Sequence, residues 1–226
     1  MKKASDLRIP FTWENRRPIL LDRAMYIPGY YDRHTEWGQL DWSEEGLFGN
    51  GRPVAIEFCS GNGQWIGEQA KNNPEWNWVG VDRLFERARK IWAKIHREEI
   101  SNLFAVCSDA LTFIRHYVPP SSVHVAYINF PDPWPKLRHA KKRLVRQEFL
   151  QELGRVLLPQ GKLIVVTDDL GYVEWMQNEF SCLPEWQSDY PAPGYLTNVE
   201  NLGRSFFNDL WMKQGRTIYY LKYTYG

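Results

Sequence analysis

Four acidic residues stand at or just after the ends of short apolar segments, where a strand of a sheet would present them to a ligand. They are Glu57, Asp82, Asp109 and Asp132. A single acid in such a place is usually a turn former or the N-cap of a helix. Because ligands of open α/β sheets bind beyond the carboxyl ends of the strands, four acids at these ends predict one ligand site.

A short glycine loop, Ser60-Gly61-Asn62-Gly63, follows the first of these segments. Gly61 and Gly63 let the backbone approach a ligand closely, and the helix predicted after them presents free N–H groups. Asp82 lies nineteen residues beyond Gly63, where an acid at the end of the second strand can accept both hydroxyls of a ribose. The loop and the acids together predict a site for a nucleotide-like cofactor.

Two cofactors fit such a site, a dinucleotide and S-adenosyl-L-methionine. The dinucleotide fingerprint G-x-G-x-x-G requires a glycine three residues after its second glycine, and Ile66 occupies that position here. S-adenosylmethionine carries no phosphate and needs contacts only to its adenosine and its amino acid end. Glu57 could order the loop or meet the ammonium group of that end. The residues therefore favour the methyl donor.

The segment 129–143 combines a proline-locked turn with a block of cations. Pro131 and Pro133 flank Asp132 and fix the backbone φ angle on both sides of it. From 136 to 146 the chain has six Lys or Arg residues and no Asp or Glu. Taken alone, the turn could be a rigid structural element and the basic block a solvated face. Together they indicate a reaction site beside a surface for a polyanion, whose phosphates such cations would position.

Strands and helices are predicted to alternate through the middle of the chain. Apolar runs predict strands at 53–59, 76–81, 103–107, 123–130 and 162–167, and helical spacing predicts helices at 64–73, 84–98, 110–117, 144–157 and 172–180. This order predicts an α/β fold with a mostly parallel, doubly wound sheet. Residues 1–50 show no sustained period and are predicted to form an irregular N-terminal extension to a single domain, 51–226. Residues 184–204 are predicted as a loop, and 217–224 as a final antiparallel strand.

Composition limits the classes of protein to which the chain can belong. The 226 residues carry a formal net charge of +1 and contain no run of eighteen apolar residues, so no membrane span is predicted. The N-terminus lacks the apolar segment of a secretion signal, and the three isolated cysteines fit a reducing compartment rather than a disulfide framework or a zinc site. We therefore expect a cytoplasmic protein with no metal site and no obligatory protein partner.

These residues together resemble one family, the bacterial tRNA (guanine-N7-)-methyltransferases. The most specific match runs from Phe130-Pro131-Asp132-Pro133-Trp134-Pro135-Lys136 through Arg138-His139 to Lys141-Lys142-Arg143-Leu144. Further matches are Pro53 to Gly63, Trp78 to Asp82, Ser108 to Ala110, Thr167-Asp168 and Thr197 to Glu200, so the resemblance covers about residues 45–222. Cys59 and Ser60 depart from the family, which commonly has a glycine and a small or aromatic residue there. Asp82 stands where a glutamate is frequent, and these departures bear on cofactor affinity rather than on cofactor identity.

The resemblance implies a class I methyltransferase fold, with seven strands of which the last is antiparallel, and S-adenosyl-L-methionine as the cofactor. By carry-over, the cofactor site would be lined by Glu57, Gly61, Gly63, Asp82, Asp109 and Asp132. The guanosine region of a tRNA, in its variable loop, would be contacted by Lys136, Asp168, Thr197, Asn198, Val199 and Glu200. The RNA backbone would be contacted by Arg138, His139, Lys141, Lys142 and Arg143. Asp132 would also be the catalytic residue.

Methylation of guanine N7 needs no general base, because that nitrogen carries a lone pair and no proton. The ring becomes cationic, so Asp132 is expected to stabilise positive charge and to accept hydrogen bonds from the base. Trp134 could stack on the base or pack against the sheet. Two alternatives stay open: a class I methyltransferase that acts on another RNA base or on a protein, and a non-catalytic RNA-binding module on the same scaffold. The presence of all four acids argues against the second alternative.

Overall fold

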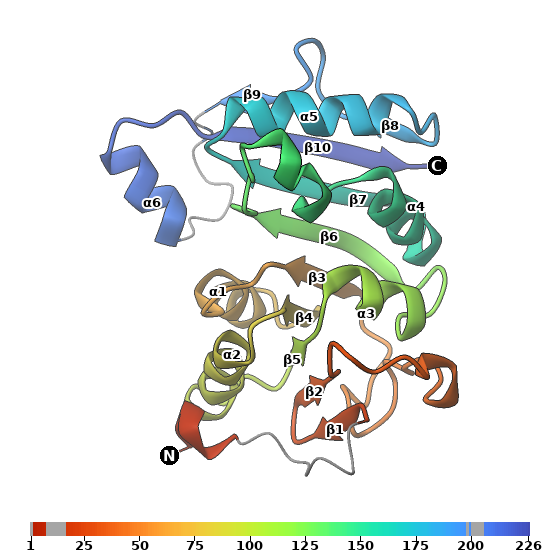
Figure 1. Cartoon of the computed structure of the whole chain (residues 1–226). Coiled ribbons are helices and arrows are strands. Elements are labelled where there is room, and N and C mark those ends of the chain that lie inside the picture. The colour runs from red at the N-terminus through yellow and green to blue at the C-terminus, as the bar shows by residue number, and fades with distance from the viewer. Residues whose placement is uncertain (1, 8–16, 198, 200–205) are drawn as a thin grey trace. The chain divides into compact units, whose positions relative to one another are not determined.

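Figure 1 shows the computed structural model of the chain, which describes residues 2–7, 17–197, 199 and 206–226. The chain forms two compact units, 1–119 and 120–226. Each unit contains strands of a sheet with helices packed against them. None of the described helices has both the length and the apolar character needed to cross a membrane.

The first unit is organised on three parallel strands, β3 (Val54–Phe58), β4 (Asn77–Asp82) and β5 (Leu103–Cys107). β4 lies between the other two strands. Every residue of the three strands is buried, as the continuous apolar runs predict for a parallel sheet that is covered on both faces.

Three helices follow these strands: α1 (Gln64–Asn72), α2 (Phe85–Arg97) and α3 (Ala110–His116). α1 and α2 both pack against β4, and α2 also packs against β5. The buried residues of α2 include Ala88, Ile91, Trp92 and Ile95, which recur at the spacing of one helical face. The predicted helices and strands of this unit are therefore confirmed to within a few residues.

A short hairpin within the first 50 residues was not predicted. β1 (Ile19–Leu21) pairs antiparallel with β2 (Ala24–Tyr26), and β2 pairs in parallel with β5 (Figure 1). Short 3-10 helices, η1 (Ala4–Asp6) and η3 (His34–Glu36), lie in the same region. Three-residue strands are too short to show an alternating pattern, which explains why the sequence indicated only irregular structure. The domain boundary at residue 50 stays a prediction.

The second unit is organised on β6 (Val123–Asn129) and β7 (Leu157–Thr167), which pair in parallel. The last strand, β10 (Tyr219–Tyr225), pairs antiparallel with β7, as predicted. Two short strands, β8 (Trp186–Ser188) and β9 (Leu196–Thr197), also pair with β10, so the predicted loop at 184–204 is wrong in part. The described residues form ten strands, three more than the resemblance implies, and four of the ten (β1, β2, β8 and β9) have only two or three residues.

The helices of the second unit are η4 (Leu137–Lys142), α4 (Gln147–Val156), α5 (Leu170–Ser181) and α6 (Phe206–Lys213). α6 was not predicted, because its segment adjoins residues that read as loop. The predicted turn Pro159-Gln160-Gly161 lies inside β7, where the pairing with β6 shifts register between Val123 and Val125. Gln160 has a φ of 64° there, so the turn signal marks a bulge rather than the start of the strand.

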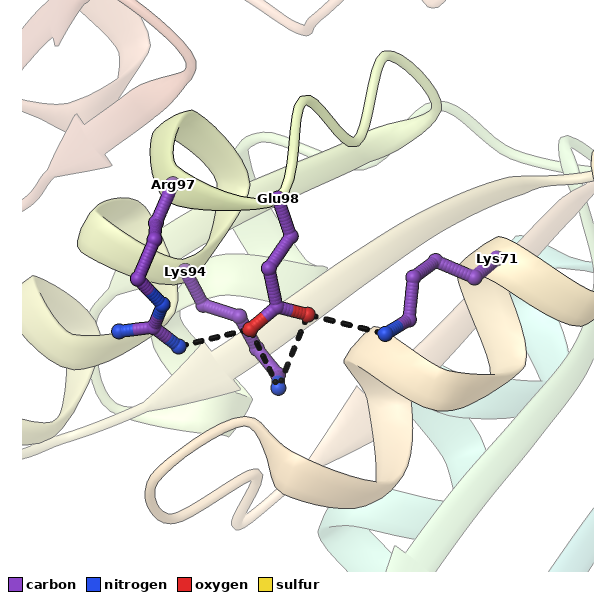
Figure 2. Close-up of polar contacts among 4 residues, drawn as sticks. All are labelled: Lys71, Lys94, Arg97 and Glu98. Carbon is purple, nitrogen blue, oxygen red and sulfur yellow. Dashed lines mark hydrogen bonds and ion pairs between the residues drawn. The ribbon is translucent and has the colours of Figure 1, made fainter. Parts of the chain in front are cut away.

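A single carboxylate joins the two helices α1 and α2 of the first unit. Glu98, just after α2, receives hydrogen bonds from Arg97 at 2.7 Å, from Lys71 of α1 at 3.0 Å and from Lys94 at 3.1 Å (Figure 2). Burial by itself would raise the pKa of Glu98, but the hydrogen bonds from these three cations outweigh burial and lower the pKa to about 2. The ionised form of Glu98 therefore contributes to the stability of the folded protein.

Replacing Glu98 with Gln should remove part of the pH dependence of the free energy of unfolding. The pKa of this group falls from 4.5 to about 2 on folding, so its contribution is complete above pH 4.5 and is lost as the pH falls towards 2. Urea unfolding at several pH values between 6 and 2 measures this. The gap in stability between wild type and Glu98→Gln should close as the pH falls, whereas Glu99→Gln, at the exposed next residue, should leave the pH profile unchanged.

Candidate functional site

The glycine loop, residues 60–63, lies between β3 and α1, and hydrogen bonds of Ser60 hold its start to the sheet. Ser60 N donates to Val81 O of β4 at 3.1 Å, and Ser60 Oγ donates to Glu57 O at 2.8 Å. Gly63 N donates to Ser60 O at 2.9 Å and closes the turn. These bonds fix the path of the backbone at the carboxyl end of β3.

The two glycines of the loop have different reasons to be glycine. Gly63 has a φ of 69°, and an added Cβ would lie 2.6 Å from Cγ1 of Ile91 on α2, so a side chain would separate the two helices. Gly61 has a φ of 55°, but its added Cβ would meet nothing closer than 4.0 Å. Open space therefore adjoins the backbone at Gly61, where a ligand can approach it closely.

Asp82 ties the glycine loop to the start of α2. Its side chain is 5% exposed, Oδ2 accepts from Gly61 N at 2.9 Å, and Oδ1 accepts from Leu84 N at 2.8 Å. Arg87 Nη1 lies 3.5 Å from Oδ2. A carboxylate oxygen can accept more than one hydrogen bond, so Asp82 keeps capacity for a further donor such as a ribose hydroxyl. The ribose role stays a prediction, and the structure adds a role in shaping the loop.

Glu57 and Asp109, the other two strand-end acids of the first unit, lie at the same edge of the sheet as Asp82, because β3, β4 and β5 are parallel. Glu57 is 2% exposed on β3. Asp109 is exposed and caps α3, since its Oδ1 accepts from Thr112 N at 3.1 Å. Cys107, beside Asp82 in the strand register, has its pKa raised to about 12, first by burial and then by the negative charge of Asp82. This edge can hold a ligand that offers donors to Glu57, Asp82 and Asp109.

In the second unit, the turn after β6 presents Asp132 to solvent. Phe130 N donates to Val166 O of β7 at 2.8 Å, and Pro131 is buried, so the turn begins from a fixed position. Phe130 and Trp134 have φ angles of 50° and 42°, which side chains other than glycine rarely adopt. The carboxylate of Asp132 is exposed between these anchored residues. The turn is anchored at its start and carries an accessible acid, and the rigidity expected from its prolines stays a prediction.

Arg143 donates hydrogen bonds to the backbone of this turn, which differs from the role predicted for it. Its Nε donates to Pro133 O at 2.9 Å and its Nη2 to Trp134 O at 3.2 Å. The guanidinium carbon lies 4.5 Å from the ring centre of Trp175 and 5.6 Å from that of Tyr172, both on α5. Arg143 is only 7% exposed. It was predicted to contact RNA phosphates, but burial and its hydrogen bonds commit it to the turn that carries Asp132.

The rest of the basic block remains available to a ligand. Lys136, Arg138, Lys141 and Lys142 are exposed, and His139 is half-buried. Lys142 Nζ lies 4.5 Å from the ring centre of Trp134, and the His139 ring meets the Trp134 ring edge to face at 5.6 Å. Trp134 therefore packs against η4, which is neither the sheet nor the base, the two partners considered for it.

Asp168, predicted to contact the guanosine, follows the end of β7 and forms an ion pair with Arg216. The Arg216 guanidinium lies 4.0 Å from the ring centre of Trp211 on α6. The sequence did not single out Arg216 or Trp211. A signal was present, because Arg216 directly precedes the predicted last strand, which brings it beside the end of β7 once that strand is antiparallel.

The segment predicted to contact the guanosine near the end of the chain is described only in part. Thr197 lies on β9, is exposed, and pairs with Tyr219 of β10. Val199 is partly buried and packs with Phe130 against the cluster of Val166, Ile218 and Tyr220. Asn198 and Glu200 lie outside the described residues. Within the second unit, the structure thus brings Thr197 and Asp168 to neighbouring strand ends of β9, β10 and β7.

Comparisons with known proteins agree on the class. A family model described as a putative methyltransferase matches residues 51–221. A tRNA (guanine-N(7)-)-methyltransferase of Chlamydia felis is 42% identical over 221 residues, which cover 98% of this chain and 96% of the relative. A protein of the same name from Rubrobacter xylanophilus is 34% identical and covers 76% of this chain and 77% of the relative.

Solved structures with the same fold include the 16S rRNA methyltransferase KamB, with a TM-score of 0.58 at 18% identity, covering 81% of this chain and 94% of that chain. The antibiotic-resistance methyltransferase Kmr has a TM-score of 0.51 at 19% identity and covers 77% of this chain and 88% of that chain. The fold is therefore that of the class I S-adenosylmethionine-dependent methyltransferases. Within this class, the chain belongs to the bacterial tRNA (guanine-N7-)-methyltransferase family, as the full-length relatives show.

The residues at the edge of the first unit fit the cofactor of this class. The open space beside Gly61 lets a ligand approach the backbone. The loop lacks the third glycine that the dinucleotide fingerprint uses to bind a pyrophosphate. Three carboxylates at one edge suit a ligand that carries ribose hydroxyls and an ammonium group and no phosphate. This donor set matches S-adenosylmethionine.

Replacing Cys59 with Gly should stabilise the protein. Cys59 has a φ of 60°, a left-handed conformation that costs an L-residue about 1–2 kcal/mol. Glycine removes this cost but loses more entropy on folding, so the net gain in the free energy of unfolding should be roughly 0.5–1 kcal/mol. Thermal and urea unfolding measure it. Cys59→Ala is the control, since it removes the thiol and keeps the strained backbone; an equal gain in that variant would refute the argument.

Arg143 and its exposed neighbours should respond differently to substitution. Arg143→Gln should lower the free energy of unfolding by about 2–4 kcal/mol, because two partly buried carbonyls lose a charged donor and the buried charge is removed from its site. Lys141→Gln with Lys142→Gln should leave stability nearly unchanged and lower the salt slope of tRNA binding by roughly 1.4–1.8. Arg143→Lys keeps the charge without the planar fork and should also destabilise. If Arg143→Gln kept full stability and lowered the salt slope of tRNA binding, the phosphate contact predicted for Arg143 would be supported instead.

Proposed function

We propose that this protein transfers a methyl group from S-adenosylmethionine to N7 of a guanosine in tRNA, and that this guanosine lies in the variable loop. The observation that carries the proposal is the anchored turn after β6, which presents one exposed carboxylate next to four exposed cations. The relatives from Chlamydia felis and Rubrobacter xylanophilus are named for this activity. The cytoplasm, where tRNA is found, is the compartment that we propose.

The first unit is proposed to hold the methyl donor, whose sulfonium supplies an electrophilic methyl group. Gly61 offers backbone that a ligand can reach, and Gly63 keeps α1 close to α2 so that the loop keeps its path. Asp82 is proposed to accept from the ribose hydroxyls while it holds Gly61 N. Glu57 is proposed to meet the ammonium end, and Asp109 the adenosine. All three acids favour a cationic ligand over a phosphorylated one.

The second unit is proposed to orient the guanosine. N7 attacks with its own lone pair, so no residue has to remove a proton first. Asp132 is proposed to accept hydrogen bonds from the base and to stabilise the positive charge that develops on the ring. A well-placed group of this kind contributes about 3–4 kcal/mol to transition-state stabilisation. Its value depends on position, which is why the anchoring of the turn by Pro131 and Arg143 matters.

Further contacts to the substrate are proposed for residues close to these strand ends. Asp168 is proposed to accept from the guanine edge while its ion pair with Arg216 fixes its position. Thr197 is exposed on β9 and can contact the ribose or phosphate of the same nucleotide. Lys136 is proposed to contact the guanosine region, and Arg138, His139, Lys141 and Lys142 the RNA backbone. Because phosphate contacts carry no base identity, selection of the guanosine falls to Asp132 and Asp168.

Replacing Asp132 with Asn or Ala should lower the rate of methyl transfer to tRNA at least about 100-fold. The residue is exposed, so the fold should be retained, and tRNA binding should not weaken, because a negative charge is removed. The assay incubates unmodified tRNA with labelled S-adenosylmethionine and analyses nucleosides for 7-methylguanosine. Glu174→Gln, which removes an exposed acid of α5, serves as the control and should keep full activity.

The nucleoside analysis also separates the alternatives. Label in 7-methylguanosine supports the proposed reaction, and label in another base or in protein would support the other methyltransferase reading. No label in any acceptor, with tRNA binding intact, would support a non-catalytic RNA-binding module. Full activity in Asp132→Ala would remove the role assigned to that residue and leave the reaction itself standing.

A further inference from the structure

A basic cleft lies on the first unit, whereas the basic block of η4 belongs to the second unit. It has a volume of about 580 Å³ and is bounded by α1, α2 and the N-terminal residues around η1. Five of its ten lining residues are cations, and one is an acid. The charged members are Lys2, Lys3, Lys90, Lys94, Arg97 and Glu68. Since the chain as a whole carries a net charge of only +1, this is a local concentration of positive charge.

The cleft follows the line where α1 and α2 approach each other. An added Cβ at Gly67 would lie 2.5 Å from Cε of Lys94, so the aliphatic part of Lys94 rests directly on α1. Both helices start at the carboxyl ends of neighbouring parallel strands and so run in the same direction. Asn62 and Gln64 line the end of the cleft at the glycine loop. The cleft therefore begins beside the proposed cofactor loop and leads away from it.

The cations are held in place but are not all neutralised. Lys94 and Arg97 share the single carboxylate of Glu98 with Lys71 (Figure 2). Lys90 Nζ donates to Asn62 Oδ1 at 3.2 Å, which is a neutral partner. Lys3 is exposed in the segment before η1. Three cations on one carboxylate and one cation on an amide leave an excess of positive charge.

The wall formed by the N-terminal residues is fixed to α2 rather than loosely attached. Arg89 Nε donates to Ala4 O at 2.7 Å, and Lys2 forms an ion pair with Asp22. Lys2 Nζ also lies 5.2 Å from the ring centre of Trp92. Lys3, between these two anchors, is thereby kept at the rim of the cleft. Because these contacts already fix the N-terminal residues and their cations, little conformational entropy is lost when a ligand binds the cleft.

We propose that this cleft binds the sugar-phosphate backbone of the tRNA outside the stem-loop that carries the methylated guanosine. The proposal rests on the proposed function, in which tRNA is the polyanion that the protein binds. Lysines supply point charges for phosphates, and the amides of Asn62 and Gln64 can donate to phosphate or ribose oxygens. Such a contact positions the tRNA without reading its sequence, so it favours a folded tRNA over a short RNA.

The test replaces Lys3 and Lys90 together with Gln and measures the Kd for unmodified tRNA between 50 and 200 mM salt. The loss of two phosphate contacts should raise the Kd roughly tenfold and lower the salt slope by roughly 1.4–1.8. Lys162→Gln with Lys213→Gln removes the same charge from the second unit, at a lysine paired with Asp189 and at an exposed lysine of α6, and should change neither quantity. Lys90→Arg keeps the charge and should keep the affinity.

Two further measurements identify the ligand. The Kd of a short stem-loop that contains the target guanosine should rise much less than that of full-length tRNA. Inorganic tripolyphosphate serves as the probe for a small-anion site. If it binds the cleft tightly and the Kd for tRNA does not change in the variant without Lys3 and Lys90, the proposal is overturned in favour of such a site. An unchanged Kd and salt slope in the double variant, in a protein whose wild type forms 7-methylguanosine, would overturn the cleft and leave the proposed function intact. Absence of that product would instead count against the function.

Discussion

The buried guanidinium of Arg143 is the interaction on which the second unit's site depends. It donates to two successive carbonyls of the turn and lies against the rings of Trp175 and Tyr172, so α5 supports the turn through one side chain. The same helix is linked to the chain after η4, since Trp175 Nε1 donates to Val145 O and Tyr172 Oη accepts from Val145 N. An exposed acid keeps a fixed position only when its backbone is fixed. Arg143 supplies that constraint, while the exposed cations around it stay available to solvent.

In the first unit, hydrogen bonds keep the glycine loop ordered while space beside it stays open. Its backbone hydrogen bonds run to β3 and β4, and Asp82 binds the loop at Gly61 N. Gly63 is required because Ile91 of α2 occupies the space of a side chain. The close approach of α1 and α2 continues past Gly67 to the carboxylate of Glu98. The loop, the helix pair and the basic cleft are therefore parts of one packing arrangement.

Much of this could be predicted from the sequence, and the failures have physical causes. The long apolar runs and the helical spacing predicted the main strands and helices, whereas the assignment of the strand-end acids to a cofactor site stays a prediction. Strands of two or three residues, as in β1, β2, β8 and β9, carry no pattern of their own and form because a neighbouring strand is present. Composition alone cannot separate Arg143 from Lys142, because burial of one and exposure of the other depend on where α5 lies. Arg216 was missed because its partner Asp168 is 48 residues away in the chain.

The pairing of the last strand has a consequence for how the protein is made. Among the described strands, β8 and β9 pair only with β10, which follows both of them in the chain. On the ribosome, these two strands have no partner until β10 has been translated and has left the exit tunnel. The first unit, complete at residue 119, can fold while the second is still being synthesised. A substitution that prevents β10 from pairing would therefore leave β8 and β9 without a partner among the described strands, while the first unit keeps its own strand pairs.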